Sequence, residues 1–123
     1  MNYAWTDEYL LQKPGVEKDF KAEWGSWRYM IRGKMLVMQG GDKTDRPILT
    51  IKLDPALSEL LRAQYEQIVP GYYSNKTHWS SLYLDGEAQV PDETVRGMLD
   101  NAHELILNGL SKKIREEILQ TSK

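Results

Sequence analysis

The sequence predicts an α+β domain in which an antiparallel sheet of about four strands is covered on one face by helices. Residues 27–32 and 48–53 alternate apolar and polar side chains with a period of two, which is typical of half-buried strands. Segments that open at Asp54 and Pro91 carry apolar residues at three- and four-residue spacing, which is typical of amphipathic helices. This combination favours a two-layer sandwich.

The N-terminal helix is predicted at residues 6–13. Thr6 can cap it, Asp7 and Glu8 lie in its first turn, and Pro14–Gly15 cannot continue it. Residues 20–27 are irregular and aromatic, and no element is predicted there.

Three strands are predicted to form an antiparallel meander. In the first, 27–32, Trp27, Tyr29 and Ile31 share one face, and Arg28 and Arg32 share the other. Gly33–Lys34 can make a tight two-residue turn with glycine first, which leads into a return strand at 35–39. After a polar loop, the strand 48–53 places Thr50 and Lys52 on the solvent side.

The second half of the chain is predicted to be mainly helical. Asp54–Pro55 opens a helix that ends before Pro70–Gly71. A strand at 78–84 follows, and then a long helix from Pro91 that stops at Asn108–Gly109. Ser111 can cap a last helix. The predicted buried faces are Leu57, Leu60, Leu61 and Tyr65 in the first of these helices, Val95, Met98, Leu99, Ala102, Leu105 and Ile106 in the second, and Ile114 and Ile118 in the third.

Length and composition limit the class of protein. The 123 residues leave room for one domain, 1–123, and no repeat or linker divides it. There is no cysteine, which excludes disulfides, thiolate zinc sites and thiol catalysis. The longest aliphatic run, 35–38, is too short to cross a bilayer, and Asp7 and Glu8 stand where a secretory signal would be apolar. We therefore expect a soluble, cytoplasmic monomer.

The charges are segregated along the chain. Residues 24–53 hold six basic and two acidic residues, a net of +4, whereas residues 84–108 hold one basic and six acidic residues, a net of −5. The exposed sheet face is therefore expected to be positive, with Arg28, Arg32, Lys34 and Lys52. Long basic side chains can simply cover an exposed sheet, or they can form an anion-binding surface. The overall net charge of −2 argues against a generic polycation.

The segment 70–79 is the densest unusual motif. It combines Tyr72, Tyr73 and Trp79 with Lys76 and His78 around a glycine turn. Aromatic planes beside cations can stack bases and contact phosphates. The same aromatics can instead fill the core, and Asn75 can stabilise the turn through its side-chain amide.

This segment resembles the MmcQ/YjbR-type family, and so do several other motifs over nearly the whole chain. They are Lys13–Pro14–Gly15–Val16–Glu17, Gly33–Lys34–Met35, Leu84–Asp85–Gly86 and Leu110–Ser111–Lys112–Lys113–Ile114–Arg115. The resemblance implies a CyaY-like α+β fold. It also implies DNA binding, since members are described as DNA-binding, partly because their fold resembles a double-wing DNA-binding arrangement. Where the family pattern has a Ser–Tyr pair, this chain has Ala102–His103.

Catalysis is not expected. The only histidines are His78 and His103, and neither a nucleophile elbow nor a phosphate-binding glycine loop is present. No spacing of His, Asp and Glu predicts a metal site, and the comparison with iron-binding frataxins finds only Asp7 and Glu8 in the first helix. We therefore expect no metal and no cofactor.

Three functional hypotheses follow. The first is a protein that binds DNA or another polyanion through the basic sheet face, Lys76 and His78, with Tyr72, Tyr73 and Trp79 available for stacking. The alternative is a protein-interaction or accessory module that uses those aromatics or the acidic long helix. A weaker third hypothesis is small-ligand binding between the Tyr72 turn and the sheet.

Overall fold

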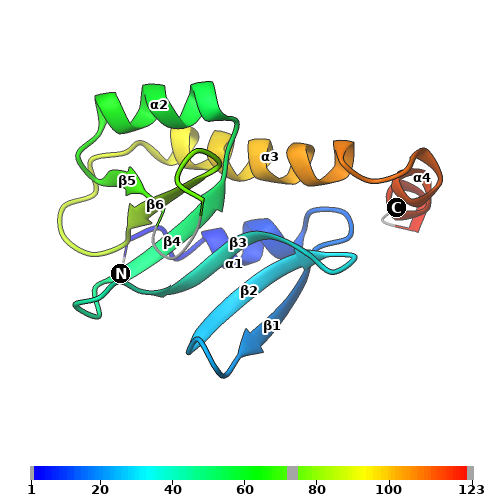
Figure 1. Ribbon diagram of the computed structural model, residues 1–123, viewed down its shortest axis with the longest axis horizontal. Helices are drawn as coiled ribbons and strands as arrows, with labels where there is room; N and C mark the ends of the chain where they lie inside the picture. Colours follow the sequence, from blue (N-terminus) through cyan, green and yellow to red (C-terminus); the bar gives the residue numbers. More distant parts are fainter. Residues whose placement is uncertain (1, 72–74, 122–123) are drawn as a thin grey trace.

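The computed structural model describes residues 2–71 and 75–121, so Tyr72 and Tyr73 lie outside the described residues. The described chain forms, in order, α1 (Thr6–Leu11), β1 (Glu17–Lys21), β2 (Ser26–Ile31), β3 (Lys34–Gly41), β4 (Pro47–Lys52), α2 (Pro55–Gln64), β5 (Ile68–Pro70), β6 (Trp79–Tyr83), α3 (Asp92–Asn108) and α4 (Lys112–Thr121). Figure 1 shows the helices and the sheet as separate layers, which confirms the α+β class.

The sheet has six antiparallel strands in the order β1-β2-β3-β4-β6-β5, so the prediction of about four strands was wrong. The two unpredicted strands lie at the edges. In β1, Phe20 is the one apolar residue among four charged ones, and β1 is largely exposed, so no apolar periodicity marks it. Strand β5 is only three residues long and ends at Pro70, which an edge strand tolerates.

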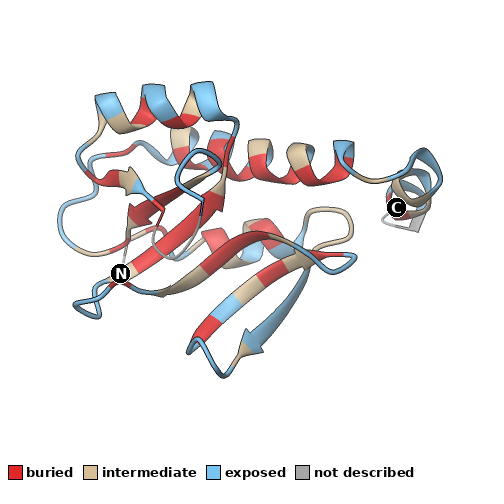
Figure 2. Cartoon of the chain, in the orientation of Figure 1, coloured by how far each residue is buried: buried red, intermediate tan, exposed pale blue. Residues whose placement is uncertain are grey.

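The core lies between the sheet and the helices. Helix α3 packs against β3 and β4, and α2 packs against β5 and β6. One apolar cluster joins Leu10 of α1, Ile51 of β4, Leu61 of α2 and Leu99 of α3, each at most 5% exposed. Figure 2 shows buried positions on the strands of the sheet and along α3. We call the sheet face away from this core the outer face.

Helix α2 differs from its prediction. It ends at Gln64, before Tyr65 turns into extended backbone, and this leaves room for β5. Leu60 was predicted to be buried but is 61% exposed, whereas Ser58 is buried. The Ser58 hydroxyl accepts a hydrogen bond from the Ser80 hydroxyl on β6. Ser58, and not Leu60, therefore lies on the buried side of the helix, where this polar contact is satisfied.

The turn between β2 and β3 also differs. Ile31 pairs with Lys34, so the two turn residues are Arg32 and Gly33 rather than Gly33 and Lys34. Both have left-handed backbones, with φ of 49° and 80°. Two positive φ values are the signature of the type I′ hairpin turn. Arg32 therefore lies in the turn and not on a strand face.

The other helices follow the sequence more closely. The predicted Thr6 cap of α1 was wrong: Thr6 is the first residue of the helix and Trp5 occupies the cap position. The Thr6 hydroxyl donates to the carbonyl of Tyr3, and no side-chain hydrogen bond from a described residue caps the helix. The Ser111 hydroxyl accepts from the amide of Ile114, which confirms the predicted cap of α4. No helix in the described ranges is both long enough and apolar enough to span a membrane.

Gly71 offers a test of how tightly the start of β6 is packed. A Cβ at Gly71 would lie 2.8 Å from the Cβ and 2.9 Å from the carbonyl oxygen of Trp79. We expect Gly71→Ala to destabilise the fold by about 1–3 kcal/mol because backbone must move. Gly97→Ala is the control, since its Cβ meets open space on α3 and should stabilise by about 0.5–1 kcal/mol. Urea unfolding measures both, and equal effects of the two variants would contradict this packing.

Candidate functional site

Arg28 lies on the outer face, where the sequence places it, but its charge is neutralised. Its Nε and an Nη donate to the two carboxylate oxygens of Asp19 on β1, at 2.8 and 2.6 Å. Asp19 is the direct strand partner of Arg28. The guanidinium holds the pKa of the Asp19 carboxyl below its usual value through this hydrogen bond. A bidentate pair of this kind leaves little charge for another anion.

Arg32 and Lys34 lie at the β2–β3 turn. Arg32 is 3.5 Å from the carboxylate of Glu117 on α4. Lys34 is exposed and makes no ion pair with a described residue. Figure 1 shows this turn at the opposite side of the sheet from β6. The structure therefore does not bring these two cations together with Lys76 and His78.

Lys52, Lys76, His78 and Trp79 do come together, and we call this set the positive corner. Lys52 is the strand partner of Trp79 at the end where β4 stops and β6 begins. The carbonyl of His78 accepts a 2.8 Å hydrogen bond from the amide of Leu53, the residue after Lys52. Lys76 and His78 are exposed, while Lys52 and Trp79 are half-buried. No described residue forms an ion pair with Lys52, Lys76 or His78.

Arg62 of α2 holds the backbone of this corner in place. Its guanidinium donates to the carbonyls of Lys76 and Trp79 and to the hydroxyl of Ser80. Burial lowers the pKa of Arg62 from its usual value. Arg62 was missed by the sequence analysis. Its one signal is its place next to Leu61 in an amphipathic helix, and nothing in the sequence indicates that it contacts carbonyls 14 to 17 residues away.

A second backbone constraint comes from Asn75, and it agrees with the turn role considered for that residue. The Asn75 side-chain oxygen accepts from the amide of Thr77 at 2.8 Å. The Asn75 carbonyl also accepts from the amides of His78 and Trp79. The Lys76 and His78 side chains are therefore carried on a short turn that is held at both ends.

Part of the outer face between Arg28 and Lys52 is buried. Thr50 was predicted on the solvent side, yet Thr50 and Ser81 are fully buried, and their hydroxyls lie 2.8 Å apart. Glu17 and Asp19 lie on the same face as Arg28 and Lys52 by strand register. The face therefore carries both signs of charge.

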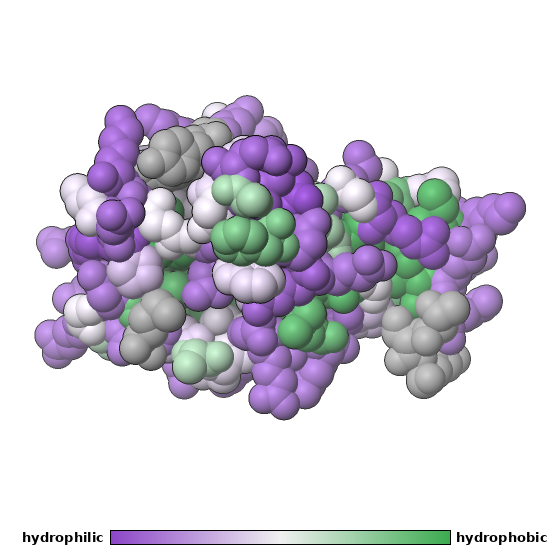
Figure 3. Space-filling model, turned by 90° about the horizontal axis from the view of Figure 1, so that it is seen from below, coloured by the Kyte–Doolittle hydropathy of each residue, from purple (hydrophilic) through white to green (hydrophobic). Residues whose placement is uncertain are grey.

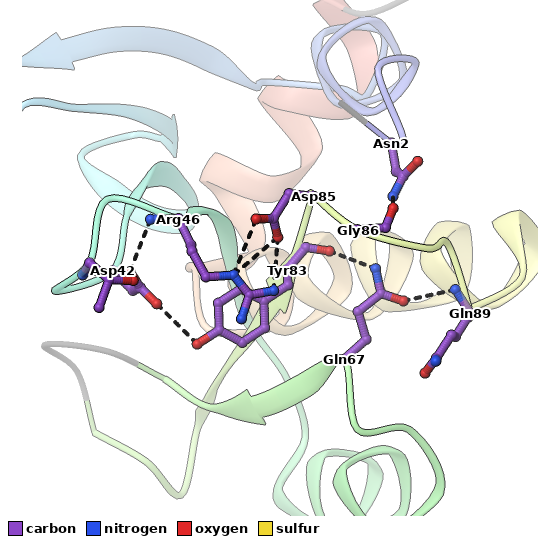
Figure 4. Close-up of polar contacts among 9 residues, drawn as sticks. Asn2, Asp42, Arg46, Gln67, Tyr83, Asp85, Gly86 and Gln89 are labelled. Carbon is purple, nitrogen blue, oxygen red and sulfur yellow. Dashed lines mark hydrogen bonds and ion pairs between the residues drawn. The ribbon is translucent and has the colours of Figure 1, made fainter.

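A polar network lies at the end of the sheet where β4 begins and β6 ends, as Figure 4 shows. The Asp42 carboxylate accepts from the Thr44 hydroxyl, the amides of Thr44 and Arg46, and the Tyr83 hydroxyl. Arg46 pairs with Asp85 and lies 3.8 Å from the centre of the Tyr83 ring. This network fixes the loop between β3 and β4.

Gln67 and Asn2 tie further loops to the same end of the sheet. The Gln67 amide donates to the carbonyl of Tyr83 and accepts from the amide of Gln89. The side chain of Asn2 donates to the carbonyl of Gly86. Figure 4 shows these contacts beside the Arg46–Asp85 pair. They hold the segment between β6 and α3 against the sheet.

His103 is a packing residue in this structure. It is buried, and its Nε2 lies 2.8 Å from the carbonyl oxygen of Pro14, to which it donates. Burial lowers its pKa below the usual value. Asp7 of α1 accepts from Lys18 and from the Tyr29 hydroxyl. In the described ranges, no group of three or more His, Cys, Asp or Glu side chains could hold a metal ion.

The β1–β2 hairpin exposes aromatic side chains. Phe20, Trp24 and Trp27 are 50%, 54% and 44% exposed, and the rings of Phe20 and Trp27 meet edge to face at 5.0 Å. Figure 3, viewed from below Figure 1, shows apolar and weakly polar surface over this hairpin, among hydrophilic surroundings. Lys18 and Lys21 pair with Asp7 and Glu23, so the hairpin has aromatic surface without free positive charge.

Comparison with known proteins identifies the family. The family model described as YjbR matches residues 11–105. The protein named "Uncharacterized protein YjbR" of Escherichia coli (strain K12) is 30% identical over 113 residues, which cover 92% of this chain and 93% of that protein. YbdF of Escherichia coli O157:H7 is 30% identical over 90 residues, covering 73% and 71%. The chain belongs to the YjbR family.

Two crystal structures resemble the fold. The Deinococcus radiodurans protein DR2400 superposes with a TM-score of 0.79 and 28% identity, covering 92% of this chain and 84% of that one. A Pseudomonas syringae protein superposes with a TM-score of 0.63 and 21% identity, covering 85% and 98%. The names of these proteins state no ligand or reaction.

The Asp42 network predicts how stability depends on pH. Hydrogen bonds, first that from the Thr44 hydroxyl, lower the pKa of Asp42 to about 2, against about 3.9 in an unfolded chain. A depressed folded-state pKa stabilises the fold above the unfolded value, and this stabilisation is lost as pH falls through the folded value. We expect Asp42→Asn to lower stability at pH 7 and to make the fall between about pH 4 and about pH 2 shallower. Urea unfolding across this range measures it, and an unchanged slope would contradict the role of the carboxylate.

Proposed function

We propose that this protein is a cytoplasmic, monomeric, non-catalytic binder of DNA or another polyanion, and that the positive corner is its contact surface. The observation that carries the proposal is that some basic residues lie beside a carboxylate and others do not. Arg28 and Arg32 lie beside carboxylates. Lys52 at the end of β4 lies next to the turn that carries Lys76 and His78, and none of these three forms an ion pair with a described residue. Phosphate binding requires cations that a neighbouring carboxylate has not already neutralised.

The backbone of the corner supports the same proposal. Arg62 and Asn75 hold the turn before Trp79, so the backbone that carries Lys76 and His78 loses little conformational freedom on binding. Trp79, opposite Lys52, offers an aromatic ring beside the cations, and Tyr72 and Tyr73 precede them in the sequence. Aromatic rings that accompany cations can stack against bases.

A non-catalytic role agrees with the two histidines. The His103 ring bonds to a backbone carbonyl, and the His78 ring makes no hydrogen bond to a described residue. A general base must itself lie within hydrogen-bond reach of the group whose proton it takes. The described residues offer binding groups, and they do not pair a histidine with a nucleophile.

The double variant Lys52→Ala/Lys76→Ala tests the contact surface. Each phosphate contact contributes about −0.9 to the slope of log K against log salt, so losing two should reduce the slope by about 2. Fluorescence anisotropy with a labelled duplex, titrated between about 50 and about 200 mM salt, measures this slope.

Arg32→Ala/Lys34→Ala is the matched control, because it removes two exposed cations at the distant β2–β3 turn. The control should bind like the unmodified protein. Three results would overturn the proposal: no binding at the lowest salt, binding that is indifferent to salt, or equal losses in both double variants.

The alternative function is a protein-interaction module, and the exposed aromatics of the β1–β2 hairpin favour it. A neutral surface with Phe20 and Trp27 half-exposed resembles the aromatic centre of a protein interface more than a phosphate site. On this alternative, Phe20→Ser/Trp27→Ser should abolish a stoichiometric protein complex that survives nuclease treatment. Leu60→Ser, which changes an exposed leucine on α2, should retain the complex. Loss of the complex in all variants, or in none, would contradict it.

A further inference from the structure

A groove runs across the outer face, away from the positive corner. Its volume is about 650 Å³, which is within the usual range of small-molecule sites. Trp24, Gly25 and Ser26 line it from the β1–β2 turn and the start of β2, Met35, Met38 and Gly41 from β3, and Asp42 and Asp45 from the loop between β3 and β4. The groove therefore lies between the aromatic hairpin and the Asp42 network.

One part of the groove is apolar and suited to a flat molecule. Trp24 is 54% exposed, so its ring can cover a ligand with its face or its edge. Met35 and Met38 contribute thioether side chains, which adapt their shape and make favourable contacts with aromatic rings. The Ser26 hydroxyl is turned to the carbonyl of Trp24, at 3.2 Å. This part of the groove therefore offers contact area and few polar groups.

The other part of the groove is negative. The Asp42 carboxylate is fixed by its four donors, and these lower its pKa to about 2, so it remains charged at neutral pH. Asp45 is exposed, and its carboxylate makes no hydrogen bond or ion pair with a described residue. Its own backbone is held in the left-handed region, with φ of 62°, by a hydrogen bond from its amide to the Asp42 carbonyl.

The cations near the groove compensate this negative charge only in part. Arg46 is engaged by Asp85, and Lys21 and Arg28, which lie 5.6 and 5.8 Å from the centre of the Trp24 ring, are paired with Glu23 and Asp19. Lys43, in the same loop as Asp45, does not line the groove. Asp45 is therefore a carboxylate without a hydrogen-bond or ion-pair partner among the described residues, at one end of the groove.

We propose that this groove binds a small organic cation with a flat apolar body, such as an aromatic amine. The apolar body lies between the Trp24 ring and the side chains of Met35 and Met38, and the ammonium group lies at Asp45, in the field of Asp42. The small residues Gly25 and Gly41 let such a ligand approach the backbone. This site is separate from the positive corner and binds the opposite charge.

Tryptamine and indole-3-acetate are matched probes, because they share the indole ring and carry opposite charges. We expect tryptamine to shift the amide signals of Gly25, Ser26, Gly41 and Asp45 in a two-dimensional NMR titration, with Kd of about 1 mM or tighter. Indole-3-acetate should bind at least about tenfold more weakly, a difference that one favourable charge contact can supply. Spermidine, a cation without the ring, should also be weaker.

Asp45→Asn tests the charged end of the site, and the exposed Asp45 side chain can be changed without removing a hydrogen bond or ion pair to a described residue. We expect about tenfold weaker tryptamine binding and loss of the preference over indole-3-acetate. Trp24→Ala should weaken both indoles. Glu104→Gln, an exposed carboxylate on α3, is the control and should leave binding unchanged. Absence of shifts at about 5 mM, equal binding of both probes, or unchanged binding in Asp45→Asn would overturn the proposal.

Discussion

The packing of α3 against β3 and β4 is the contact on which the rest of the molecule depends. Val95, Leu99, Ala102 and the facing residues of the central strands are completely buried, and burial of apolar surface is the main favourable contribution to folding. Because this packing covers the inner face of the sheet, polar and charged side chains of the same strands are directed to the outer face or the edges. The candidate binding surfaces are therefore a consequence of which face the helices occupy.

Strand register then decides which of those charges are available to a ligand. Register sets Arg28 directly opposite Asp19, and the two charges neutralise each other on the outer face of the sheet. The same register sets Lys52 opposite Trp79, an aromatic residue that cannot neutralise it. Two basic residues with the same pattern in the sequence thus have different chemistry, because a cation keeps its long-range attraction for phosphate only where no carboxylate lies within hydrogen-bond reach.

The two ends of the β4–β6 pair are organised by different polar groups. At the end where β6 begins, Arg62 binds backbone carbonyls and leaves the neighbouring cations exposed. At the other end, Asp42, Arg46, Tyr83 and Asp85 contact one another, and the Asp45 carboxylate beside them has no partner in the part of the chain that the structure describes. The protein thus separates a positive surface from a negative one on a chain whose net charge is close to zero. Such a separation gives one small domain two surfaces of opposite charge.

The local sequence pattern determined the fold class and several of the helices and strands. The α+β class, the three central strands, the α3 stripe and the Ser111 cap all follow from periodicity and capping chemistry, which depend on neighbouring residues alone. The tertiary structure decided the edge strands β1 and β5, the Arg32–Gly33 turn and the exposure of Leu60. It also decided the neutralisation of Arg28 and the role of Arg62. These depend on residues distant in sequence, and a single sequence does not record which carboxylate or carbonyl will lie beside a given cation.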